Sequence, residues 1–280
     1  MNGRLLTLAA ALAGAAHGAQ AQRWRTLDAS RQLRDTTPLN VRVEYAAGRL
    51  DLAPGTTSDL YAMHLRYDAD RVEPLSRFDS AARALAIGVR SAQLSWNRGE
   101  REEGTMQATL SARVPMELTL EIGAVEGDVQ LGGLRLTDFA LKGGAAELTL
   151  RFDAPNPVPM RAMTLEVGAA DVKVLHAINA QTERVQATVG VGALDLDFTG
   201  PLAHDLDISA SLALGDFTLR VSPEVGVYAD ASTFLGDLSD SGLEKRAGGW
   251  YSPGYDKATR HVRVRLRSLI GGFKVKRTPA

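Results

Sequence analysis

Apolar and polar residues alternate with a period of two along most of the chain, whereas the period of an α-helix is nearly absent. The alternation is clearest in five segments, 41–45, 118–122, 148–150, 172–174 and 262–266. Gly, Pro, Asp and Asn bound these segments, as expected of half-buried strands, whose successive side chains point to opposite faces. The pattern predicts an all-β chain, with short helices only at 24–33 and 80–86.

One short phrase recurs with small residues at its centre. It reads LTLEIGAVEGDVQL at 118–131, MTLEVGAADVKV at 163–174 and VQATVGVGALDL at 185–196. The first apolar residue after the small ones recurs every 19–24 residues, at Val129, Leu148, Val172, Leu194, Phe217 and Leu238. Related phrases begin at Gly48 and Gly271.

A unit of this length is too small to bury its own apolar face, so successive units must stack. We therefore predict a single-stranded β-solenoid, a β-helix in which each unit forms one coil about 4.8 Å from the next. A β-sandwich with evenly spaced strands stays open as the alternative, because sandwiches show turn signals every 8–12 residues or so.

The bends of the coils require small residues for two reasons. Glycine reaches positive φ at no steric cost, and stacked corners leave little room for a Cβ atom. We predict a structural corner role for five glycines: Gly123, Gly143, Gly168, Gly190 and Gly215.

The pattern divides the chain into four parts. They are a signal peptide at 1–21, a short N-terminal segment at 22–39, an N-terminal β-unit at 40–115 and the solenoid repeats at 116–277. Within the β-unit, strands are predicted at 60–67 and 85–89, with a turn at 68–70. The polar stretch 97–104 is predicted to be an exposed loop at the boundary with the repeats.

The first residues have the features of an export signal. Arg4 precedes the short apolar run 5–16, and Ala19-Gln20-Ala21 fits a cleavage site. The apolar run is too short to span a bilayer, and no later run is long enough, so no transmembrane segment is expected. We expect a periplasmic or extracellular protein of a bacterium. The chain has no cysteine, which excludes disulfides and thiolate metal sites.

Charge is distributed unevenly along the chain. The formal net charge is −1, or −2 without Arg4, and eight basic residues but no acidic one follow Asp256, so residues 22–256 carry −10. An acidic body with a basic tail bears on association rather than on fold.

The basic tail predicts a surface for an anionic partner. In the strand 260–267, His261 and three arginines share one face, and two lysines alternate in the same way further on. The candidate residues are Arg263, Arg265, Arg267, Lys274, Lys276 and Arg277. An anionic lipid, an anionic glycan or an acidic envelope protein would fit; nucleic acid is not expected, given export and the lack of interleaved aromatic residues. The alternative is a solvated face that protects the last coils from edge-to-edge aggregation.

Acidic residues directly precede most of the recurring apolar residues in the series from Val129 to Leu238. They are Asp128, Glu147, Asp171, Asp216 and Asp237, with Asp195 displaced by one. Stacked carboxylates could bind Ca²⁺ or serve a polysaccharide lyase or hydrolase. We favour the simpler interpretation, in which they accept hydrogen bonds from turn amides, and we expect no metal and no cofactor.

Histidines and aromatic residues give no catalytic signature. His64, His176, His204 and His261 are too far apart in sequence to form a local metal pair, and no serine lies in a G-x-S-x-G turn. The aromatic stretch 250–255 is interpreted as a cap over the C-terminal end of the apolar rows, with an exposed contact loop as the alternative. We therefore do not expect an enzyme.

Several phrases resemble a known family. Residues 45–52 (YAAGRLDL), Leu60-Tyr61 and the strand end Arg66-Tyr67-Asp68 resemble the N-terminal part of toast-rack proteins. The later coils and the closing IGGFKV at 270–275 resemble the LiaF-like, cell-wall-active antibiotics response domain and the adhesin-like β-solenoids. The resemblance covers most of 40–277 and implies a right-handed β-solenoid at the bacterial envelope, adhesin-like or linked to envelope stress through partners. It supplies no catalytic residues.

Overall fold

The computed structural model describes residues 23–91, 103–235 and 241–279. Nearly all of its regular structure is strand. The strands are β1 (Trp24–Gln32), β2 (Leu39–Gly55), β3 (Asp59–Asp68), β4 (Val72–Asp79), β5 (Ala84–Ser91), β6 (Thr105–Ser111), β7 (Pro115–Gln130), β8 (Arg135–Arg151), β9 (Met163–Leu175), β10 (Arg184–Phe198), β11 (Leu206–Val221), β12 (Gly226–Leu235), β13 (Glu244–Arg246), β14 (Gly249–Tyr251), β15 (His261–Ile270) and β16 (Phe273–Arg277). Two single-turn 3₁₀ helices are η1 (Ala177–Ala180) and η2 (Tyr255–Lys257).

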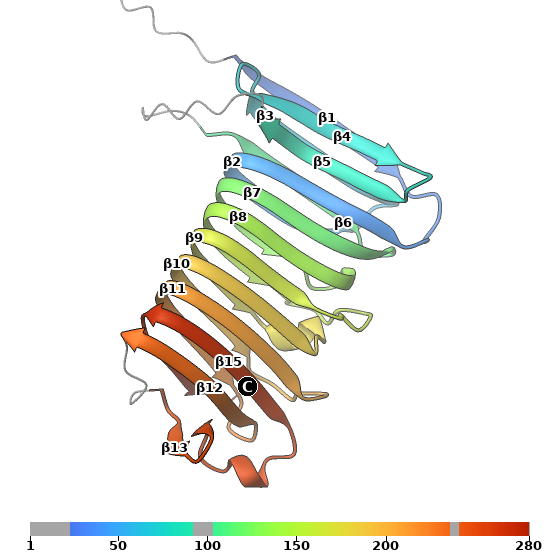
Figure 1. Cartoon of the computed structure of the whole chain (residues 1–280). Helices are drawn as coiled ribbons and strands as arrows, with labels where there is room; N and C mark the ends of the chain where they lie inside the picture. The colour runs from blue at the N-terminus through green and yellow to red at the C-terminus, as the bar shows by residue number, and fades with distance from the viewer. Residues whose placement is uncertain (1–22, 92–102, 236–240, 280) are drawn as a thin grey trace, which may run out of the picture.

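The long strands stack in parallel and each bends once, so that it belongs to two layers. Figure 1 shows β2, β7, β8, β9, β10 and β11 side by side, with the bend along one edge of the stack. The halves before the bend form the layer toward the viewer, here called the front layer, and the halves after the bend form the back layer. Thus β2 pairs with β5 before its bend and with β6 after it, while β7 runs beside both halves.

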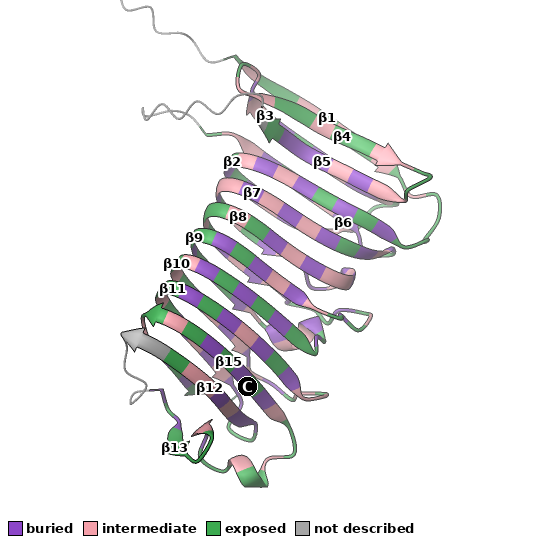
Figure 2. Ribbon diagram, viewed as in Figure 1, coloured by how far each residue is buried: buried purple, intermediate pink, exposed green. Residues whose placement is uncertain are grey.

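The apolar core lies between the two layers and is built from rows of equivalent residues. Leu148, Val172, Leu194 and Phe217 are register partners in β8 to β11, and Phe273 of β16 continues the row. All five are buried, and the rings of Phe217 and Phe273 stack with centroids 5.2 Å apart. Figure 2 shows buried residues alternating with less buried ones along the long strands of the stack.

This register confirms the predicted β-solenoid. Each long strand lies parallel to its neighbours and spans both layers, unlike the strands of a sandwich, which stay in one sheet. The predicted series of recurring apolar residues is wrong at its first member. Val129 pairs with Leu150 and with Leu52, so it lies two residues out of step with Leu148. Leu238 lies outside the described residues.

Both predicted helices are wrong. Residues 24–32 form β1, which pairs antiparallel with β3 and packs Leu27 and Ala29 against the core. Residues 80–83 form a turn, in which the side chain of Asp79 accepts hydrogen bonds from the Ala81 and Ala82 amides, and β5 follows. In both places a neighbouring strand supplies hydrogen-bond partners that a short helical pattern cannot match. The strands at 60–67 and 85–89 are confirmed as parts of β3 and β5, and the turn predicted at 68–70 lies one residue later, at 69–71. Most of the predicted loop 97–104 lies outside the described residues.

The two ends of the stack depart from the repeat. At the N-terminal end, β1 and β3 cover β6, and β4 covers β5, both through antiparallel pairing. At the C-terminal end the chain order is broken, because β15 lies between β11 and β12. Although β15 follows β12 in the sequence, β12 and not β15 is therefore the last long strand of the front layer.

The aromatic stretch lies at this C-terminal end. The hairpin of β13 and β14 pairs with the start of β12 through Trp250 and Tyr251. Rings of Tyr228, Tyr251 and Tyr255 follow one another at 5.0 Å between centroids. The stretch thus packs on the last strand of the stack, as the cap interpretation predicts.

Candidate functional site

The six residues of the predicted basic surface do not form one surface. Arg263, Arg265 and Arg267 point outward from β15 in the front layer, whereas Lys274 and Lys276 point outward from β16 in the back layer. Arg277 is turned to the end of the stack, where its guanidinium donates hydrogen bonds to the carbonyl groups of Pro253 and Val225. The bend between β15 and β16 separates the two groups.

The front arginines are partly neutralised by the strands on either side. Arg263 lies 3.3 Å from Asp205 and 3.6 Å from Asp207, and Arg267 lies 3.1 Å from Asp230. Asp205 directly precedes β11, Asp207 lies at its start, and Asp230 lies in β12. They reach the arginines because β15 is inserted between these two strands. Within the described part of the chain, Arg265, Lys274 and Lys276 make no ion pair. The free positive charge is therefore smaller than the sequence indicates.

The predicted corner glycines lie at or beside the bend, where the backbones of successive coils approach closely. A Cβ atom on Gly168 would lie 2.9 Å from the carbonyl oxygen of Gly144, and one on Gly190 or Gly123 would collide with the backbone of the coil below. At Gly143 the obstacle is the side chain of Ile122, at 2.8 Å. Positive φ, the second predicted reason, applies only to Gly215 among the five, with φ of 144°. Gly192 and Gly271, which the prediction omitted, also combine positive φ with a backbone collision.

Two members of the acidic series, Asp171 and Asp216, accept hydrogen bonds from backbone amides, as the simpler interpretation expects. Asp171 accepts a hydrogen bond from the Ala193 amide at 2.9 Å. Asp216 accepts one from the Gly272 amide at 2.8 Å, again just beyond the bend of the next coil. Asp128 instead belongs to another row and pairs with Arg151. Asp237 lies outside the described residues. No group of three or more acidic or histidine side chains that could hold a metal ion occurs in the parts that the structure describes.

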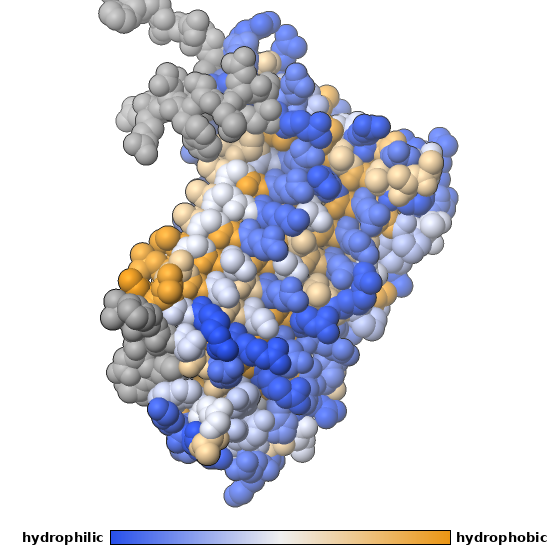
Figure 3. Space-filling view, in the orientation of Figure 1, coloured by the Kyte–Doolittle hydropathy of each residue, from blue (hydrophilic) through white to orange (hydrophobic). Residues whose placement is uncertain are grey.

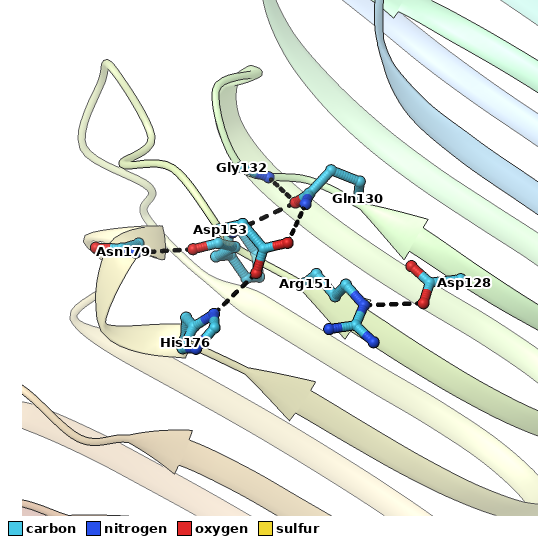
Figure 4. Close-up of polar contacts among 8 residues, drawn as sticks. Asp128, Gln130, Gly132, Arg151, Asp153, His176 and Asn179 are labelled. Carbon is cyan, nitrogen blue, oxygen red and sulfur yellow. Dashed lines mark hydrogen bonds and ion pairs between the residues drawn. The ribbon is translucent and has the colours of Figure 1, made fainter. Parts of the chain in front are cut away.

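Polar ladders tie neighbouring coils together on the side opposite the bend (Figure 4). Asp153 lies between Gln130, which donates a hydrogen bond at 2.6 Å, and the Nδ1 atom of His176 at 2.8 Å. The hydrogen bond with His176 is the main cause that lowers the pKa of Asp153. Arg151 donates to Asp128 at 2.8 Å. His176 is thus a structural residue.

A buried amide strengthens the same side of the stack. The side chain of Asn156 is fully buried. Its Oδ1 accepts from the Leu136 amide at 2.9 Å, and its Nδ2 donates to the carbonyl groups of Leu136 and Val158. All its hydrogen-bonding groups are used, as burial of an amide requires.

A shallow groove of about 580 Å³ crosses the outer face of the back layer near the N-terminal end. Its polar side chains form one outward row across five strands, with Asp28, His64, Gln107, Asp51 and Asp128 as successive register partners. His64 and Asp28 lie 2.7 Å apart. The sequence could not reveal this row, because it joins residues from five separate segments.

A group of exposed apolar residues, which was not predicted from the sequence, lies at the bend. Val191, Leu214, Leu269 and Ile270 are 44–59% exposed and follow the edge of the stack in its C-terminal half. Figure 3 shows apolar surface gathered on this edge. A signal was present in the sequence, because each of these residues lies within two positions of a glycine at the bend.

A family model described as "N-terminal domain of toast_rack, DUF2154" matches residues 19–175. The chain therefore belongs to the toast-rack family, and its all-β stack of coils is the fold expected from that resemblance. No curated protein matches the chain. No helix in the described residues is long and apolar enough to cross a membrane.

The solved structures that match the chain include three bacterial proteins. A "putative cell adhesion protein" from Clostridium sporogenes is 12% identical, with a TM-score of 0.47 over 91% of this chain and 100% of the other. A "putative adhesin" from Bacteroides fragilis is 10% identical, with a TM-score of 0.38 over 91% and 98% of the two chains. Another from Parabacteroides merdae is 8% identical, with a TM-score of 0.29 over 90% and 97%.

Proposed function

We propose that the chain is an exported, non-enzymatic protein of the bacterial cell envelope that acts as a rigid scaffold and holds another envelope component on its outer surface. The proposal is supported by the export features of the first residues and by the toast-rack family. The observation that carries it is the register of the coils, which turns outward side chains from distant segments into continuous rows.

The tied coils suit a scaffold better than a catalyst. Arg161 bridges Glu117 and Asp138 at 2.7 and 2.6 Å, and Arg220 holds Asp195 at 2.6 Å. Each such bond joins different levels of the stack, which resists bending between them. The carbohydrate-active enzyme that the stacked acids suggested would need carboxylates free to act. Most of the described acids of that series instead hold amides or arginines of the neighbouring coil.

The groove on the back layer is the proposed contact for this component. Its row offers amide, carboxylate and imidazole groups on a floor of small residues, which include Ala53, Ala62 and Thr109. A flat polar groove of this kind suits an extended partner that lies across the strands and exchanges hydrogen bonds with several levels at once. Its acidic residues favour a partner with positive charge, in keeping with the acidic body of the chain.

Blocking the groove tests this function. The purified chain would be sedimented with isolated envelope fractions, and the bound amount compared with that of Gln107→Trp. The matched control is Gln186→Trp, the same change at an exposed outward position on the front layer. We expect Gln107→Trp to lower binding at least tenfold and the control to leave it unchanged. Equal binding by both variants would remove the groove from the proposal, and absence of binding by the unmodified chain would overturn the scaffold role.

A further inference from the structure

The exposed apolar residues at the bend form a continuous ridge. Val191, Leu214 and Ile270 are register partners in β10, β11 and β15, and Leu269 lies beside Ile270. They include every large hydrophobic residue that is exposed in the described part of the chain. Apolar side chains gathered in this way differ from singly scattered ones, which need no explanation, and indicate contact with another surface.

The fold does not require large residues at this position. The same register position holds an alanine in the four preceding long strands, namely Ala47, Ala124, Ala145 and Ala169. The bend is built equally well in those strands. The large side chains add little to the core and remain about half exposed. Their size is therefore explained by contact with another molecule and not by packing within the coil.

A groove runs along the front of the ridge. Its volume is about 660 Å³. Several outward positions beside the ridge carry small residues, and the lining of the groove includes Thr188, Gly190, Ser211, Ala213, Arg267 and Leu269. The apolar ridge and the groove therefore involve the same strands, β10, β11 and β15, and lie next to each other on one molecule.

We propose that two copies of the chain associate through this edge, so that the ridge of each copy enters the groove of the other. A two-fold axis produces both contacts at once, as in any isologous dimer. The small number of large side chains indicates a weak interface, with a Kd on the order of micromolar. The inference goes beyond the proposed function and does not rest on it.

Charge decides between the two possible orientations of the axis. The front flank of the ridge carries Arg265, which makes no ion pair within the described residues, and Arg267, which is paired with Asp230. The back flank carries the exposed carboxylates of Asp216 and Asp171. An axis parallel to the stack sets the basic flank of one copy against the acidic flank of the other. An axis across the stack sets basic against basic and acidic against acidic, which costs energy. The dimer is therefore parallel, with equal levels of the two stacks facing each other.

Single cysteines test the orientation, since the natural chain has none. Val191→Cys, Leu214→Cys and Ile270→Cys would each be oxidised under mild conditions at about 100 µM, well above the expected Kd. In the parallel dimer all three should form self-linked dimers. An antiparallel dimer would instead link Leu214→Cys to itself and Val191→Cys to Ile270→Cys. The control Ala81→Cys, in an exposed turn at the N-terminal end, should stay monomeric. The antiparallel pattern would overturn the orientation, and cross-linking no better than the control would overturn the dimer.

Association without cross-linking gives the second readout. We expect sedimentation equilibrium to show a concentration-dependent dimer that Leu214→Asp weakens at least tenfold and Ala81→Asp does not change. Circular dichroism would establish that both variants fold. A chain that is monomeric at every concentration would overturn the proposal. If that monomer floats with lipid vesicles and Leu214→Asp abolishes the flotation, the ridge binds a membrane surface instead.

Discussion

The first and last coils of this solenoid share one bend but present different surfaces at it. In β2, β7, β8 and β9 the outer corner carries alanine, whereas β10, β11 and β15 carry Val191, Leu214 and Ile270 at the same register position. Their inward rows are equally apolar, because a coil that did not bury its face could not stack. Stacking therefore constrains the inward residues of every coil and leaves the outward residues free to acquire contacts with other molecules.

The glycines at the bend should be the most sensitive positions in both halves. Gly190→Val places a side chain against the carbonyl group of Gly168, which is backbone and cannot move aside. We expect a loss of about 3 kcal/mol or more in the free energy of unfolding and a sharply reduced folded yield. Gly168→Val should behave similarly. Ala169→Val, an exposed neighbour, is the control; normal melting of both glycine variants would contradict close stacking at the corner.

The contrast between inside and outside of the coil can be measured with one type of substitution. Leu165→Ala removes a fully buried side chain from an inward row and should cost about 3 kcal/mol. Leu214→Ala changes a residue that is 45% exposed, at a position where earlier coils carry alanine, and should cost less than about 1 kcal/mol. Chemical unfolding of the two variants at low protein concentration, where dimers are absent, gives both values. Similar losses would mean that the ridge serves the core.

Acid should weaken the ties between coils on the side opposite the bend. The pKa of Asp153 is lowered in the folded chain, mainly by its hydrogen bond with His176. A carboxyl group with a lowered pKa stabilises the fold above its unfolded pKa of about 4, and this stabilisation is lost as the pH falls through the folded value. We expect the melting temperature to fall below about pH 4, and to fall less steeply in Asp153→Asn. An unchanged slope in that variant would assign the acid sensitivity to other carboxyl groups.

The smallest effects are expected from the basic tail. Reversing the charge of all three front arginines should weaken retention on a sulfated polysaccharide column, and Arg265→Glu alone should produce most of that change. Arg265 makes no ion pair within the described residues, whereas Arg263 and Arg267 have acidic partners. Arg263→Glu is the matched control in the same strand. Equal losses from the two single variants would show that the ion pairs of Arg263 do not reduce its availability.

Those parts of this protein that depend on local pattern could be predicted from the sequence. Alternation predicted the strands, the recurring phrase predicted stacked coils, and the small residues marked the bend, because identical levels of a stack need the same residue type at the same place. The inward row from Leu148 to Phe273 could be predicted in this way.

Which segments lie side by side could be seen only from the pairing of the strands in the folded chain. The tertiary structure paired 24–32 with β3 as a strand, inserted β15 between β11 and β12, and thereby gave Arg263 and Arg267 their acidic partners. It also divided the predicted basic surface between two faces and joined Val191, Leu214 and Ile270 into one ridge. These outcomes depend on pairing between residues far apart in the chain. That pairing is set by the order in which the coils stack, and this order cannot be predicted from the local periodicity of the sequence.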